Sequence, residues 1–122
     1  MAKCSLSPAA AADIASILSW TQGNFGKAAR SRYGALLKQA TSDLATNPTR
    51  PGRLNCPEIS PNVFTYHLWH SRDNVPVKSL RVDKPRHFFL CRTVGQDKIE
   101  VGRVLHDAMD IDRHIPRDYQ EP

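Results

Sequence analysis

The sequence has little of what marks secreted, membrane or zinc-binding proteins. Its 122 residues include only three cysteines, an odd number without a CxxC pair: Cys4, Cys56 and Cys91. This pattern argues against a disulfide framework and against a zinc site, and it is typical of a reducing compartment. No run of apolar residues approaches the length needed to cross a bilayer. We therefore expect a cytoplasmic protein without a membrane partner.

Motifs of familiar catalytic sites are missing as well. The chain has no HExxH, no GxSxG and no glycine-rich phosphate loop, so zinc proteases, serine hydrolases and P-loop enzymes are not indicated. We expect neither a metal nor a cofactor. The composition, 40% hydrophobic and 24% charged, is that of one globular domain over residues 1–122. A net charge of +5 favours an acidic partner, although many small basic domains have none.

Two amphipathic helices are predicted in the first half of the chain. Ser7 can cap the first helix and Pro8 suits its first position, so the helix should run from about residue 8 to 21 and end at Gly23. Apolar residues recur every three or four positions from 27 to 46, where Asn47-Pro48 stops the second helix. The short connection makes the pair an antiparallel hairpin.

Strand patterns dominate the remainder. We expect a short strand at 3–7, an alternating strand at 64–69, and a hairpin of strands 86–93 and 98–105 around Gly95. Residues 50–61 are predicted as loop, and 72–85 as loop or as an extra β-ribbon through 77–82. The fold class is therefore α+β, with the helical hairpin packed on a twisted, largely antiparallel sheet. Residues 117–122 are expected to form a flexible acidic tail.

Strict alternation assigns the residues of the last strand to two faces. One face should carry Ile99, Val101, Arg103 and Leu105, and the other Glu100, Gly102 and Val104.

The stretch 76–106 contains seven Lys or Arg residues and three acidic residues. If Arg86, Arg92 and Arg103 share a sheet face, their guanidinium groups form a patch that matches phosphates or carboxylates. Alternatively, each arginine pairs with a nearby acid and only stabilises the fold. The histidines at 87, 106 and 114 suit proton transfer near neutral pH, but equally suit structural hydrogen bonds.

An ordered set of short segments resembles the ParE toxins of the RelE/ParE superfamily. The segments are Ser7-Pro8-Ala9, Gly26-Lys27-Ala28, Leu44-Ala45-Thr46-Asn47-Pro48, Arg86-His87, and Arg103-Val104-Leu105-His106-Asp107-Ala108-Met109-Asp110 with His114. The resemblance spans nearly the whole chain. It implies a RelE/ParE-like fold and a growth-inhibiting toxin of a type II toxin–antitoxin system, of the kind linked to plasmid stabilisation. It also implies a cognate antitoxin that binds the toxin in a hetero-oligomer.

The superfamily has two activities, and the resemblance favours the ParE one. ParE-like members bind and poison DNA gyrase without bond chemistry, and Arg86, Arg92, Arg103 and His106 are the predicted target-binding residues. Acidic residues follow His106, in the place where RNA-cleaving members carry a tyrosine flanked by bases. No catalytic residue is then expected.

The alternative is a RelE-like endoribonuclease that acts on mRNA at the ribosome. In that case Arg92 and Arg103 would stabilise the phosphate transition state, and His106 or His114 would transfer the proton. A third possibility is a non-toxic family member that only binds antitoxin.

For antitoxin binding, the resemblance points to the helical hairpin. The predicted anchors are Trp20, Phe25, Tyr33 and Leu37, although Tyr33 and Leu37 also fit a role in the core. The stretch between Leu68 and Pro85 is longer than the ParE pattern leads us to expect, and its role is open.

Overall fold

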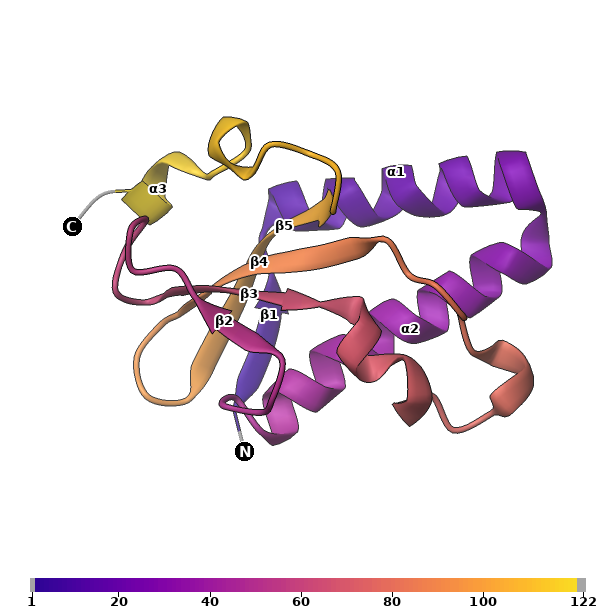
Figure 1. Cartoon of the computed structure of the whole chain (residues 1–122), viewed down its shortest axis with the longest axis horizontal. Coiled ribbons are helices and arrows are strands. Elements are labelled where there is room, and N and C mark those ends of the chain that lie inside the picture. The colour runs from indigo at the N-terminus through magenta and orange to yellow at the C-terminus, as the bar shows by residue number, and fades with distance from the viewer. Residues whose placement is uncertain (1, 121–122) are drawn as a thin grey trace.

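The computed structural model describes residues 2–120 and contains one five-stranded sheet in the order β1-β5-β4-β3-β2 (Figure 1). β1 is parallel to β5, and every other neighbouring pair is antiparallel. The predicted α+β fold with a largely antiparallel sheet is confirmed. The strands are β1 (Lys3–Leu6), β2 (Arg53–Asn55), β3 (Val63–His67), β4 (His87–Thr93) and β5 (Lys98–His106).

The two long helices are α1 (Pro8–Phe25) and α2 (Lys27–Thr46). As predicted, the Ser7 side chain accepts the Ala10 N–H and caps α1. The expected end of α1 at Gly23 is wrong, because the helix continues through it to Phe25. The reversal takes place at Gly26, whose φ of +92° lies where only glycine is unstrained. The hairpin therefore extends about one turn further than the sequence indicated.

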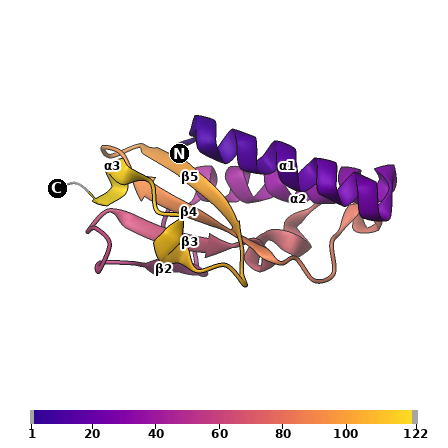
Figure 2. The same ribbon diagram turned by 90° about the horizontal axis from the view of Figure 1, so that it is seen from above.

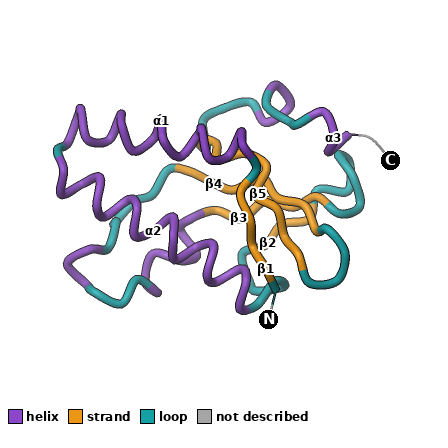
Figure 3. The backbone as a smooth tube through the Cα atoms, turned by 180° about the vertical axis from the view of Figure 1, so that it is seen from behind, coloured by secondary structure: helices purple, strands orange, loops and turns teal. Residues whose placement is uncertain are grey.

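Both helices cover the same face of the sheet (Figure 2). Seen from behind, α1 and α2 diverge from their shared turn and run toward β1 (Figure 3). The main core forms between these layers. It combines Leu36, Leu37, Ala40 and Leu44 of α2 with Phe64, Tyr66, Phe89, Ile99 and Val101 of the sheet. The strand alternation of Phe64 and Tyr66 is thus confirmed, with both side chains fully buried. The strand ends at His67 and not at Trp69, because residues 68–74 form a 3₁₀-helix.

A β-bulge changes which residues of β5 face this core. Leu90 pairs with Arg103 but the next residue, Cys91, pairs with Val101, so Gly102 has no partner on β4. The extra residue reverses the alternation that follows it. Val104 therefore joins Ile99 and Val101 in the main core, and its predicted place on the opposite face is wrong.

The other face of the sheet carries a second, smaller core. Val63 and Leu90 pack there under Tyr119 of the short helix α3 (Arg117–Gln120), together with partly buried Ile111 and Ile115. The Tyr119 ring lies against Gly102, where any Cβ would collide with it. Residues 117–120 are therefore folded, in contrast to the expected flexible tail. Residues 121–122 of that prediction lie outside the described residues.

The longest departure from the predictions lies between α2 and β4. The expected loop at 50–61 contains β2, which completes the edge of the sheet. The suggested β-ribbon at 77–82 is wrong, because this stretch instead contains the 3₁₀-helix η2 (Lys78–Leu80), which follows η1 (Leu68–Asn74). Pro76 and Pro85 lie on either side of this stretch and lack N–H donors, so strand pairing could not extend through them. Across residues 2–120, no helix combines the length and apolar character that a bilayer crossing requires.

Candidate functional site

A groove of about 840 Å³ lies between the helical hairpin and the segment that leads into β4. One wall is formed by α1 and α2, and the other by residues 81–87 and the end of β5. Ile17, Trp20 and Phe25 supply apolar surface. Four cations and one acid line the groove: Arg32, Arg81, Lys84 and Arg86, with Asp83. We call residues 81–86 the strap. The groove is thus apolar with a basic border.

Trp20 and Phe25 are the most unusual residues of this groove, because they leave large apolar surfaces in water. Trp20 is 61% exposed and Phe25 is 67% exposed. Their rings contact each other edge to face, with centroids 5.7 Å apart. Two adjacent exposed aromatic side chains above an apolar groove are typical of a protein-binding surface.

Behind the aromatic residues, Tyr33 and His87 form a close hydrogen bond. The Tyr33 hydroxyl lies 2.5 Å from His87 Nδ1 and 3.3 Å from the Arg86 amide nitrogen. Burial lowers the pKa of His87 to about 4, with His106 as the next cause, and burial raises the pKa of Tyr33 to about 12. Both side chains are therefore neutral at pH 7, so Tyr33 accepts the amide N–H and donates its own proton to His87.

Asp107 links the end of β5 to β3 and to the strap. It accepts from Arg86 Nε at 3.1 Å and Nη2 at 2.9 Å, and it lies 3.2 Å from His67 Nε2. The hydrogen bonds from Arg86 are the main cause that lowers the pKa of Asp107 to about 2. His67 Nδ1 accepts the Trp69 N–H, so a neutral His67 carries its proton on Nε2 and donates it to Asp107.

His106 stands next to this network. Its ring centroid is 5.2 Å from that of His87. Two contacts compete for its Nδ1: the Ala108 N–H at 3.0 Å, and an Asp107 oxygen at 3.6 Å. The shorter contact sets the tautomer, because an Nδ1 that accepts a backbone N–H has no proton to donate to a carboxylate. His106 then presents Nε2–H, and its side chain lines the groove.

The three predicted arginines do not form a common patch. Arg103 donates to Asp13 of α1 at 2.7 and 3.0 Å, and its third nitrogen reaches the His114 carbonyl at 3.4 Å. Arg92 lies 3.4 Å from Glu100 and 3.0 Å from Asp118. Arg103 and Arg92 therefore pair with acids inside the fold, as the alternative interpretation in the sequence analysis predicted. Arg86 also has a carboxylate partner, but its side chain is 61% exposed.

Of the remaining predicted residues, the structure brings most to the groove. Trp20, Phe25, Tyr33, Arg86 and His106 all line it. Leu37 does not, because it is 4% exposed and packs in the main core. His114 lies at the end of the 3₁₀-helix η3 (Ile111–Arg113), where its carbonyl serves Arg103. Among residues 2–120, no group of three His, Cys, Asp or Glu side chains is arranged to hold a metal ion.

Comparison with known proteins identifies the family. The family model described as "ParE toxin of type II toxin-antitoxin system, parDE" matches residues 5–111. The chain belongs to the ParE toxin family. This ParE-family chain is also 32% identical over 110 residues to Toxin ParE1 of Mycobacterium tuberculosis, from strain CDC 1551 / Oshkosh and from strain ATCC 25618 / H37Rv. The alignment covers 90% of the chain and 94% of each relative. The resemblance seen in the sequence is thereby confirmed.

Several residues around this groove were not predicted as site residues. His67, Lys84 and Asp107 come from three segments, and only the fold brings them beside Arg86. His87 was considered, but its partner Tyr33 is 54 positions away. No local spacing links such residues. A usable signal was the aromatic and basic content of 67–86, which the sequence shows plainly.

Proposed function

We propose that this ParE-family toxin acts by binding DNA gyrase and holding it on cleaved DNA, and that an antitoxin segment in the groove neutralises it. The groove carries this proposal. It offers exposed Trp20 and Phe25 as anchors and four cations around them. An amphipathic acidic helix matches that combination, because its apolar face covers the aromatic rings while its carboxylates meet the basic border.

The geometry supports a binding role more than RNA cleavage. Transition-state stabilisation needs cations that are free to meet the reacting phosphate. Arg103 donates its guanidinium hydrogen bonds to Asp13 and to a backbone carbonyl, and Arg92 pairs with two acids. Beside His106 the groove instead offers the hydrogen-bonded Tyr33–His87 pair. The endoribonuclease remains the alternative that the test below must exclude.

The test is induction of the chain in a bacterial host that lacks its antitoxin. DNA breaks and message integrity are followed in the same culture. We expect gyrase-dependent breaks while messages stay intact. Rapid cleavage of translated messages without breaks would contradict the proposal and favour the endoribonuclease. A soluble, folded protein with neither effect would favour the non-toxic antitoxin-binding role.

The antitoxin half of the proposal is tested separately, by co-purification with the antitoxin encoded beside the toxin gene. We expect Trp20→Ala and Phe25→Ala each to weaken the complex by about tenfold or more, because truncating a central aromatic anchor commonly costs at least 1–2 kcal/mol. Leu54→Ala is the control, since Leu54 is equally exposed at 67% but lies on the edge strand β2. Equal losses for all three variants would contradict a specific role of the groove.

A further inference from the structure

A second concave surface lies on the other side of the strap. It is an open depression of about 440 Å³, lined by side chains that include His67, Trp69, His70, Lys84 and Arg86. We call these five residues the Trp69 surface. They come from β3, η1 and the strap, and Pro85 and Asp107 complete the lining. It is shallower and smaller than the groove, so it does not suit a helix.

The aromatic component of this surface is the indole of Trp69. Its residue is 46% exposed. The Arg72 guanidinium lies 3.5 Å from the centre of the ring, so a cation covers one face. The side chain also lines the open depression. A flat ring held in place by a stacked guanidinium is prepared to stack on a second planar group.

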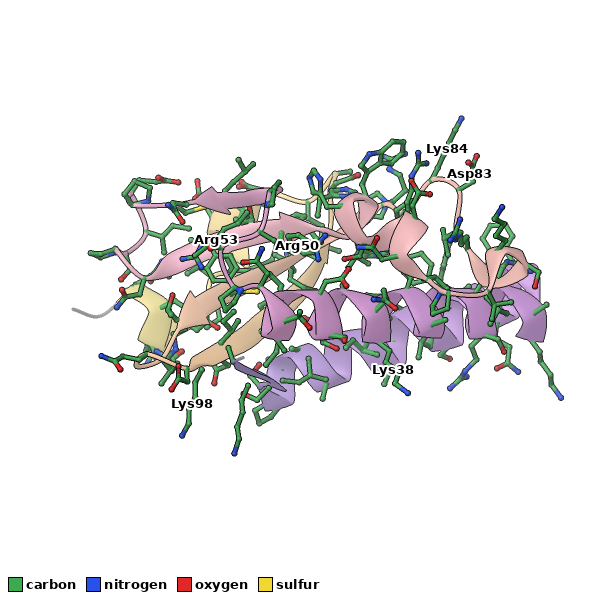
Figure 4. The ribbon with its side chains drawn as sticks, turned by 90° about the horizontal axis from the view of Figure 1, so that it is seen from below. Lys38, Arg50, Arg53, Asp83, Lys84 and Lys98 are labelled. Carbon is green, nitrogen blue, oxygen red and sulfur yellow. The ribbon has the colours of Figure 1, made fainter. Side chains whose placement is uncertain are left out.

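The cationic component is Lys84 and Arg86, which flank buried Pro85. Asp107 binds Arg86 through Nε and Nη2, and within residues 2–120 no acceptor is found for Nη1. The aspartate therefore orients the guanidinium without using all of it. Lys84 is exposed and forms no ion pair within the described part of the chain. In Figure 4, Lys84 projects from the opposite side of the molecule to Lys38 and Lys98.

The net charge of the surrounding segment has the same sign. Residues 68–86 contain five Lys or Arg and two Asp. Both aspartates lie beside Arg72, each with a carboxylate oxygen 3.9 Å from one of its guanidinium nitrogens. The pKa of His70 is lowered, mainly by burial and then by positive neighbours, so this imidazole offers a neutral planar edge at pH 7. The depression thus combines planar rings with two outward cations.

From these observations we infer that the Trp69 surface binds single-stranded nucleic acid, with a base stacked on Trp69 and backbone phosphates on Lys84 and Arg86. Stacking on an aromatic platform beside cations is how single strands are bound without sequence preference. An acidic peptide matches the cations but leaves the indole and imidazole faces unused. A duplex keeps its bases stacked on one another and cannot use the ring. The inference needs no gyrase and stands apart from the function proposed above.

The test uses the purified chain and a fluorescein-labelled oligothymidylate of about 12 nucleotides, within the span that such surfaces cover. Binding is followed by fluorescence anisotropy across a series of salt concentrations. We expect Trp69→Leu to weaken binding by about tenfold, the usual order for loss of one stacked base, and Trp69→Phe to retain most of the affinity. The ring, rather than general packing, then accounts for the loss.

The cations are tested through the salt dependence. Lys84→Ala and Arg86→Ala should each lower the slope of log affinity against log salt by about 0.7, the value for one phosphate contact with a single strand. Lys38→Ala and Lys98→Ala are controls of equal charge on other faces, and their slopes should match the wild type. Circular dichroism of each variant checks that the fold is intact.

An independent readout comes from tryptophan fluorescence. The chain has two tryptophans, so Trp20→Phe leaves Trp69 as the single reporter. Quenching of Trp69 by the oligonucleotide is the expected result, with uridylate and thymidylate strands equally effective. The inference is overturned if Trp69 is not quenched, or if all four lysine and arginine variants lose affinity alike. It is also overturned if a polyglutamate peptide or a duplex of matched charge binds more tightly.

Discussion

Arg86 and Arg103 each bind an aspartate through two nitrogens, yet they serve opposite purposes. Arg103 directs Nε and Nη2 to Asp13 and Nη1 to the His114 carbonyl, and its side chain is 26% exposed. Arg86 directs only Nε and Nη2 to Asp107 and is 61% exposed. The first pair fastens α1 to β5 and the C-terminal segment. The second holds a guanidinium outward at the meeting point of the groove and the Trp69 surface.

Whether a paired arginine stays available to a binding partner depends on what else its carboxylate partner binds. Asp13 also accepts the Val104 N–H at 2.9 Å, beyond the point where β1 stops pairing with β5 at Leu6. It therefore satisfies a strand edge as well as a charge. Asp107 instead reaches His67 and links side chains at the surface.

The largest expected effect concerns the C-terminal segment that covers Arg92. Tyr119 is 2% exposed, and Arg92 lies over its ring. Tyr119→Ala should lower the free energy of unfolding by about 3 kcal/mol, because it empties most of the second core. Tyr119→Phe should cost about 1 kcal/mol, since it removes only the hydroxyl hydrogen bonds to Glu100. Urea unfolding measures both; equal small losses would mean that this segment contributes little to stability.

The next largest effect is expected as a difference in stability between variants of the two aspartates, Asp13 and Asp107. Asp13→Ala leaves a largely buried guanidinium and the Val104 N–H without their acceptor, so we expect a loss of about 2 kcal/mol. Asp107→Ala should cost at most about 1 kcal/mol, because Arg86 regains water. Urea unfolding of the two variants side by side is the measurement. A greater loss for Asp107→Ala would reverse the comparison drawn above.

A smaller effect should appear with pH at the groove. The pKa of His87 is about 4 in the fold and 6.5 ordinarily, so the unfolded chain binds this proton more readily. The stability gained by keeping His87 neutral in the fold is fully present above pH 6.5 and is lost as the pH falls toward 4. For a fully buried histidine this contribution to the free energy of unfolding would be about 3 kcal/mol. The partial access of His87 to solvent reduces the contribution to about 1–2 kcal/mol.

Comparison with His87→Gln isolates this contribution, because the variant should show a flatter stability profile between pH 6.5 and 4. Tyr33, His67, Arg86, His106 and Asp107 all face His87 or act on its charge. The pKa of Asp107 is lowered from 3.8 to about 2, so its own contribution is lost only below that window. Parallel profiles for wild type and variant would contradict the assignment to His87.

The smallest expected change in stability is that of Arg86→Ala. Its side chain is mostly exposed, so the free energy of unfolding should stay close to that of the wild type. The same variant should lose oligonucleotide affinity, as described above. Urea unfolding and anisotropy on one preparation separate these two quantities. A large loss of stability would make Arg86 a structural residue like Arg103.

Local chemistry was sufficient for much of the fold. The bounds of α2 at 27 and 46 were predicted to the residue, because its apolar periodicity and Asn47-Pro48 act within a few positions. The Ser7-Pro8 helix start and the β4–β5 hairpin were predicted for similar reasons. Gly23 misled the prediction of the α1 end, because a glycine inside a helix costs only about 1 kcal/mol and the contacts of the helix outweigh it.

Only some of the residues that line the groove could be predicted from the sequence. Trp20, Phe25 and Tyr33 were predicted as binding residues, and the structure lines the groove with them. Leu37 was predicted as an anchor with a core role as the alternative, and the structure places it in the core. The Asp107 network unites β3, the strap and the end of β5, which lie tens of residues apart. Pairings of that kind depend on sheet order, which no local pattern encodes.

The sequence by itself determined the ParE family, the α+β class and the basic character of the stretch before β5. Tertiary structure alone decided which arginines stay available. The bulge at Gly102 places Val104 in the core, and the long α1 brings Asp13 to Arg103. Arg86 lies where the fold offers a single aspartate and open solvent. The amino-acid sequence specifies which side chains are charged. Whether a charged side chain is available to a binding partner depends on which opposite charges folding brings within a few ångströms.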